Sequence, residues 1–231
     1  LSGLSKLVTL DCSSNKLGSI DVSECESLES LKCNANHIGT LNLKNNKALT
    51  ELQCNNNAIA QLNIKNNVRL ETLYCRKNDI SVLNVTGQAY LKNLDCSNNA
   101  LTSLNVYKNA ELETLYCASN ALTSLGITAN VKLTNLDCSN NRLTAPDVSK
   151  NVLLETINCS NNALTSLDVS RNAVLNTLTC HNNASMAKLW VKDAAQKAEI
   201  TVKKDDTTVI AYNDGGINIP DAKLKEYLLA L

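Results

Sequence analysis

The segment "LDCSNNALTSL" at residues 94–104 returns almost unchanged as "INCSNNALTSL" at 157–167, and its first part returns as "LDCSNNRLT" at 136–144. The second and third copies begin at residues 157 and 136, so all three starting points differ by multiples of 21 residues. Self-similarity at a fixed period of this length indicates a solenoid, in which each repeat is one coil packed against its neighbours.

The cysteines and asparagines keep this period along most of the chain. Nine of the ten cysteines are 21 residues apart, and an asparagine follows each of them by three residues. Cys25 alone lies off the period. The periodic cysteines are Cys12, Cys33, Cys54, Cys75, Cys96, Cys117, Cys138, Cys159 and Cys180.

Each unit reads L-x-x-L-x-C-x-x-N-x-L-x-x-L-x-V-x-x-N-x-x. It resembles the leucine-rich repeat over residues 4–191, with cysteine in place of the third leucine of the signature. The nested L-D-V-x-x-N half is similar to the bacterial IRREKO-type subclass, found in surface or secreted proteins of Bacteroides-type anaerobes. This resemblance implies a right-handed solenoid with short parallel strands on a concave face, short extended segments on a convex face and little helix.

The repeated residue types fit such a coil physically. In the L-x-C stretch, leucine and cysteine point inward and the intervening residue points outward, since side chains alternate along a strand. We therefore expect Cys96 and Cys117 to lie in the core. Asn99 and Asn120 are expected to satisfy backbone groups of the turn that follows the strand and of the next coil.

The thiols are predicted to be structural rather than reactive. Nine cysteines in register cannot all form disulfides, no C-x-x-C pair marks a zinc site, and inward-facing thiols lack the exposure that a nucleophile needs. Cys25 occupies the second asparagine position of the first coil. Because that position is in a turn, Cys25 is predicted to be the accessible thiol.

Composition excludes several classes of function. Lys and Arg number 22, as do Asp and Glu, so the net charge is zero and no basic stripe favours nucleic acid. The two histidines, His37 and His181, lie seven repeats apart, and no phosphate-binding or dinucleotide-binding glycine motif is present. We expect no enzyme activity, no cofactor and no metal.

The chain divides into three segments on the basis of pattern. Residues 1–191 form the solenoid of nine 21-residue coils, and residues 192–213 are expected to add cap strands that shield the last coil. Residues 214–231 contain a turn and an apolar stripe typical of a short helix. A similar I-P-D segment opens leucine-rich domains in the proteins that the chain resembles, so this segment is interpreted as the possible start of a following module.

The outward residues of the predicted concave face are mostly small and polar. The middle coils differ, because a cluster of larger side chains lies there: Tyr74, Arg76, Asp95, Tyr116 and Asp137. Tyrosine and arginine are common anchors of protein interfaces, and tyrosine with aspartate also suits sugar hydroxyls. Three interpretations remain open: a protein-binding module of the cell surface or secreted space, which the resemblance favours, a glycan-binding module, and a spacer without a ligand.

Overall fold

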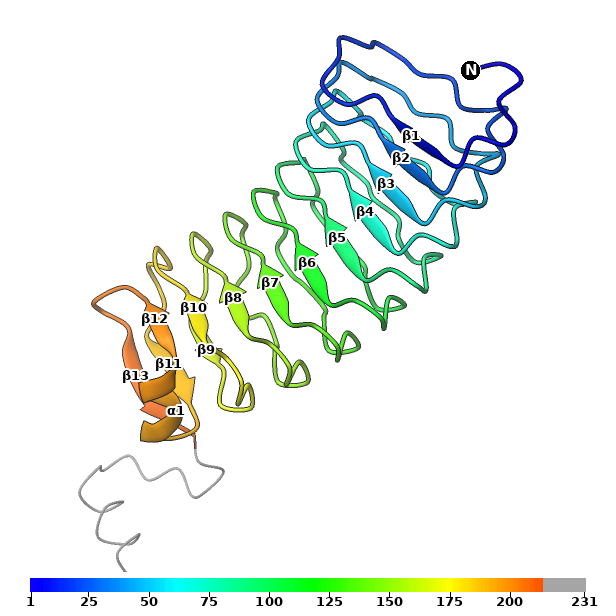
Figure 1. The fold of residues 1–231 in the computed structure, drawn as a ribbon. Helices are drawn as coiled ribbons and strands as arrows, with labels where there is room; N and C mark the ends of the chain where they lie inside the picture. The colour runs from blue at the N-terminus through cyan, green and yellow to red at the C-terminus, as the bar shows by residue number, and fades with distance from the viewer. Residues whose placement is uncertain (214–231) are drawn as a thin grey trace, which may run out of the picture.

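The computed structural model describes residues 1–213, which form a solenoid with one long parallel sheet along its concave face (Figure 1). The expected helix within 214–231 lies outside the described residues. The ten strands of this sheet follow one another in chain order. They are β1 (Thr9–Asp11), β2 (Ser30–Lys32), β3 (Glu51–Gln53), β4 (Thr72–Tyr74), β5 (Asn93–Asp95), β6 (Thr114–Tyr116), β7 (Asn135–Asp137), β8 (Thr156–Asn158), β10 (Thr177–Thr179) and β12 (Thr201–Lys203). The leucine-rich repeat solenoid predicted from the 21-residue period is confirmed.

The strands pair in the register that the repeat dictates. Leu73 of β4 lies opposite Leu94 of β5, which lies opposite Leu115 of β6. Each strand ends early because the second residue after every periodic cysteine has a φ between 53° and 58°, in the left-handed region. A strand cannot continue through that conformation.

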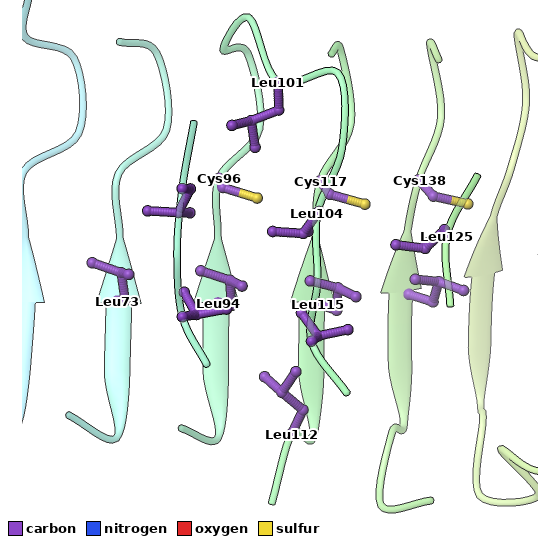
Figure 2. Packing of buried hydrophobic residues seen from close by; sticks show 14 of the residues in the cluster. Leu73, Leu94, Cys96, Leu101, Leu104, Leu112, Leu115, Cys117, Leu125 and Cys138 are labelled. Atoms are coloured by element: carbon purple, nitrogen blue, oxygen red, sulfur yellow. The ribbon is translucent and has the colours of Figure 1, made fainter. Parts of the chain in front are cut away.

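The core is a narrow aliphatic column inside the coils. Leu94, Cys96, Leu101 and Leu104 of one coil repeat in the next coil as buried residues at the same positions. Figure 2 shows the sulfur atoms of Cys96, Cys117 and Cys138 pointing the same way in successive coils. Burying one such leucine contributes about 1.5–3 kcal/mol, and the identical shape of each layer lets the coils stack without gaps.

The asparagine three residues after each cysteine connects its coil to the preceding one. The Asn99 Nδ2 donates to the carbonyl oxygen of Cys96 in its own coil, at 3.0 Å, and to that of Cys75 in the coil before, also at 3.0 Å. Its Oδ1 accepts the backbone N–H of Ile80 at 3.0 Å. Asn120 repeats these bonds to Cys117, Cys96 and Leu101. These bonds form a ladder, and the coil that each asparagine reaches is the preceding one, so the prediction that it would be the next one is wrong.

A second amide ladder lies on the convex side and is more deeply buried than the first. The Asn109 Nδ2 donates at 2.8 Å to the carbonyl oxygens of Val85 and Gln88 in the preceding coil. Gln88 occupies the equivalent position there and bonds back in the same way, to Ile64 at 2.9 Å. Six of the asparagines keep a buried Oδ1 without a hydrogen-bond partner among the described residues: Asn46, Asn67, Asn109, Asn130, Asn151 and Asn172.

The convex half is extended, as predicted, and it forms a short sheet only at the C-terminal end. There β9 (Ser166–Asp168), β11 (Lys188–Val191) and β13 (Val209–Tyr212) pair in parallel. Elsewhere on this face an isolated bridge joins Asn105 and Gly126.

The C-terminal segment continues both faces rather than forming a separate unit. Its two strands do not pair with each other: β12 extends the concave sheet and β13 extends the convex one. Between β11 and β12 is a helix that the sequence analysis missed, α1 (Ala194–Glu199). The buried Gln196 of α1 donates at 3.0 Å to the carbonyl oxygens of Val169 and Asn172, so it ends the second amide ladder.

Substitution of one ladder residue tests how much the first ladder contributes. Asn99→Leu removes the donor to three carbonyl oxygens and leaves the Ile80 N–H without an acceptor. We expect a loss of about 2–4 kcal/mol in the free energy of unfolding, measured by urea titration. The exposed Asn176→Leu is the control, with an expected change within about 0.5 kcal/mol. Equal effects of the two substitutions would contradict the ladder's role.

Glycine at a left-handed position should stabilise the protein. Ala35 has a φ of 53°, a conformation that costs an L-residue roughly 1–2 kcal/mol and glycine almost nothing. Since glycine also gains about 0.5–1 kcal/mol of unfolded-state entropy, Ala35→Gly should raise stability by a net of about 0.5–1 kcal/mol. Ala58→Gly, at an exposed position with negative φ, should lower it. The midpoints of urea unfolding measure these opposite changes in stability for the two variants.

Candidate functional site on the concave sheet

The structure brings four of the five predicted site residues into one column of the concave sheet. Tyr74 of β4 lies opposite Asp95 of β5, Asp95 lies opposite Tyr116 of β6, and Tyr116 lies opposite Asp137 of β7. Neighbouring strands are about 4.8 Å apart, so phenol and carboxylate groups alternate at that interval. Arg76 lies two residues beyond Tyr74, after the end of β4, and is exposed.

The two tyrosines differ in exposure. Tyr116 is 38% exposed, whereas Tyr74 is partly buried between its neighbours. Burial raises the pKa of the Tyr74 phenol, and the charge of Asp95 raises it further. Tyr116 therefore presents the larger surface to solvent, and Tyr74 has a more fixed position.

The two aspartates have a structural role in addition to their place in the column. Asp95 Oδ1 accepts the backbone N–H of Ser97 at 3.0 Å, and Asp137 Oδ1 accepts that of Ser139, also at 3.0 Å. Asn158 makes the same kind of turn with Ser160. Each aspartate thus uses one oxygen to fix the turn after its strand, so an aspartate at this position is not in itself a sign of binding.

Sequence reasoning missed this pairing, although a signal for it was present. Wherever Asp or Asn precedes the periodic cysteine, serine follows the cysteine, as in "DCS" at 95–97 and "NCS" at 158–160. The serines of these turns are buried: Ser97, Ser139 and Ser160. The outward positions directly after the cysteines are therefore buried in most of the middle coils and offer little surface to a partner. Arg76 is the large exposed side chain at these positions.

The N-terminal part of the concave sheet is occupied by contacts within the protein. Glu51 accepts hydrogen bonds from Ser30 Oγ at 2.7 Å and from Gln53 Nε2 at 2.6 Å, and its carboxylate is 3.5 Å from Lys32 Nζ. Lys92 Nζ lies 2.7 Å from the Glu71 carboxylate. These side chains are partnered, whereas Asp95 and Asp137 make no ion pair among residues 1–213.

The prediction that Cys25 is accessible is wrong. Its side chain is fully buried in the core, and its carbonyl oxygen accepts Asn46 Nδ2 at 2.8 Å. The reason is that the second asparagine position points inward, so a small apolar thiol there packs with the coil interior. Cys12, in the first coil, is the partly exposed cysteine instead.

Burial raises the pKa of the eight buried cysteines that follow the 21-residue period. Burial raises the pKa of Cys33 to about 12, and burial together with the charge of Asp137 raises that of Cys138 to about 12. The pKa values of Cys96 and Cys117 are also raised, and burial is the largest cause. All ten cysteines are free thiols. Because the thiolate is the reactive species, these side chains act as core residues.

Residues 1–213 contain no group of three or more His, Cys, Asp or Glu side chains placed to hold a metal ion. In the same range no helix has the length and apolarity needed to cross a bilayer. Two hollows, of about 440 and 320 Å³, lie on the convex face around Asn63 and Lys65, away from the tyrosine column.

Thiol labelling tests the corrected assignment of the cysteines. In the native protein at mildly alkaline pH, iodoacetamide should modify Cys12 and leave the other nine unmodified, because burial shields them from the reagent. Peptide mass spectrometry identifies the modified residue. All ten should react after denaturation, and Cys12→Ser should abolish native labelling. Native modification of Cys25 at the rate of Cys12 would contradict this assignment.

Comparison with known proteins supports the fold at the level of structure. No protein-family model and no curated protein matches the sequence. Among solved structures, the functional domain of InlJ from Listeria monocytogenes, which includes a cysteine ladder, has a TM-score of 0.73 and 27% identity over 88% of this chain and 54% of that one.

Two further solved structures share the fold at lower identity. An LRR protein of Leptospira interrogans has a TM-score of 0.77 and 23% identity over 87% of this chain and 55% of its own. YopM, a leucine-rich effector protein from Yersinia pestis, has a TM-score of 0.68 and 22% identity over 87% of this chain and 61% of its own. The chain thus spans between half and two thirds of these bacterial structures. Its 21-residue coils, cysteine column and amide ladders are those of a leucine-rich repeat fold.

Proposed function

We propose that this chain is a non-catalytic protein-interaction module that binds its partner along the concave sheet. The observation that carries the proposal is the partly exposed column from Tyr74 to Asp137 on an otherwise small and polar face. Tyrosine and arginine anchors in the middle of a surface typically dominate binding energy. Solenoids with a long concave sheet use that face for extended contacts.

The location proposed for the module is the cell surface or the secreted space of a bacterium. The support is the resemblance of the repeat unit to surface and secreted leucine-rich proteins of Bacteroides-type anaerobes, together with the likeness to InlJ. The segment 214–231 is proposed to begin a further module. Residues 1–191 are proposed as the nine-coil solenoid, with 192–213 as its cap.

A glycan-binding module is the second candidate, because the same column offers aromatic and carboxylate groups together. Stacking on Tyr116 with hydrogen bonds to Asp95 or Asp137 suits a sugar ring. The two candidates differ in footprint. A protein partner would bury about 800 Å² on this side, across several coils, whereas a sugar would depend on one tyrosine and its neighbouring carboxylates.

A binding screen of the purified chain tests the proposal. The chain is screened against host ectodomains, matrix proteins and a glycan panel, alongside the variant Tyr74→Ala/Arg76→Ala/Tyr116→Ala. We expect a protein hit that the triple variant weakens by at least about tenfold, or ~1.4 kcal/mol, since it removes three central anchors. Surface plasmon resonance measures the affinities.

The chain offers a matched control on its other faces. Tyr90 and Tyr107 are 61% and 70% exposed and lie outside the concave sheet. The variant Tyr90→Ala/Tyr107→Ala/Lys108→Ala should bind as the unmodified chain does. A hit that is lost in this control and kept in the concave variant would refute concave binding. Glycan hits alone would favour the second candidate, and the absence of any hit would favour the spacer interpretation.

A further inference from the structure

The concave face carries an excess of negative charge between β5 and β8. Residues 92–98, 113–119, 134–140 and 155–161, which form these strands and their flanks, contain one cation, Lys92, which is paired with Glu71. They contain four carboxylates, which we call the acidic stretch: Asp95, Glu113, Asp137 and Glu155. The whole chain has a net charge of zero, so this concentration of one sign is local.

Cations flank the acidic stretch at both ends. Arg76 lies on its N-terminal side, and Lys92, whose carbonyl oxygen accepts the Glu113 N–H, is paired with Glu71 at 2.7 Å. His181 and Lys203 lie on its C-terminal side, in the coils of β10 and β12. Lys132 pairs with Glu111 at 2.7 Å. Asp95 and Asp137 make no ion pair among the described residues.

The tyrosine column crosses this surface. Tyr116 lies between Asp95 and Asp137 on the adjacent strands, and Tyr74 lies beyond Asp95. A cation above a tyrosine ring that is flanked by carboxylates gains from both the ring and the charge. The field of Asp95 and Glu51 at Tyr74, which adds to burial in raising the pKa of that phenol, has the same sign. These aromatic and acidic side chains thus favour a cationic group on the ligand.

The spacing of the two aspartates suggests the form of the ligand. Asp95 and Asp137 are two strands apart, so about 9.6 Å separates their positions along the solenoid axis. An extended polyproline-type segment has three residues per turn and rises about 3.1 Å per residue, so its side chains recur on one face every ~9.3 Å. The two intervals match within a few tenths of an ångström.

We infer that the concave face between β4 and β7 takes an extended partner segment with arginine at every third position, running along the solenoid axis. This inference rests on the proposed function and specifies its partner. Successive guanidinium groups contact Asp95 and Asp137, with the side chain of Tyr116 between them. Arginine fits better than lysine because its planar group can stack on a phenol ring while it donates to Oδ2 of an aspartate, the oxygen that the turn does not use.

Substituting the aspartates by asparagine removes the charge and preserves the turns. Asn158 already accepts the N–H of Ser160 in place of an aspartate, so Asp95→Asn/Asp137→Asn should fold normally. The matched control is Asp21→Asn/Asp147→Asn on the convex half. There both carboxylates make the same kind of turn, to Ser23 and Ser149 at 2.9 Å, and both are exposed. Each variant loses two negative charges, so the two have the same net charge. They differ in whether the charges are lost from the concave face or from the convex half.

The test uses a labelled peptide of four Arg-Pro-Pro units and fluorescence anisotropy at low ionic strength. We expect binding that falls as salt is added, that weakens at least about tenfold in the concave aspartate variant, and that changes less than twofold in the convex control. Tyr116→Ala should also weaken it severalfold. A peptide with the same composition but four consecutive arginines should bind less tightly, and a Glu-Pro-Pro peptide should not bind.

Several outcomes would overturn the inference. No binding of the Arg-Pro-Pro peptide, or equal weakening by the concave and convex aspartate variants, would remove the site. Equal binding of the consecutive-arginine peptide would remove the proposed spacing. If a partner from the screen is lost in the Tyr74→Ala/Arg76→Ala/Tyr116→Ala variant but retained in the aspartate variant, the inference fails and the proposed function stands. Failure of the proposed function is distinct, because that partner would then be unaffected by the triple variant.

Discussion

Side-chain amides that donate to the backbone of the preceding coil are the constraint on which the rest of this structure depends. A coil of 21 residues with three-residue strands leaves many carbonyl oxygens inside its turns, where water cannot reach them. The two ladders, typified by Asn99 and Asn109, supply the missing donors. The second ladder does so even though the Oδ1 atoms of six asparagines are buried without a partner, which shows that the donors are the groups the fold requires.

Once turns and core are fixed in this way, the outward residues are free to vary. The core positions tolerate only leucine, isoleucine, valine or cysteine, because each layer must match the next. The concave positions have no such requirement, and they change from a partnered network around Glu51 to a surface rich in tyrosine and carboxylate from Tyr74 to Asp137. Differences between coils therefore mark where the solenoid has been shaped for something other than its own stability.

The period of 21 residues was sufficient to predict the coils, the inward cysteines, the first ladder and the column from Tyr74 to Asp137, because each follows from side-chain alternation and register. Other features could not be derived in this way. Cys25 was misplaced because a turn position was equated with exposure, although this turn points its side chain inward. The helix α1 is too short for a periodic signal. The left-handed residues include Ala35 and Lys77, which carry no compositional sign of that backbone.

The direction of the ladders makes the two sides of each coil unequal. The amides of a coil donate to the coil before it, and its own carbonyl oxygens accept from the coil after it, as those of Val169 and Asn172 accept from Gln196. A coil is thus completed only by the one that follows it in the chain. During synthesis on the ribosome, which proceeds from the N-terminus, each coil waits for its successor to emerge before its buried carbonyl groups are satisfied. The order of translation is then also the order of assembly.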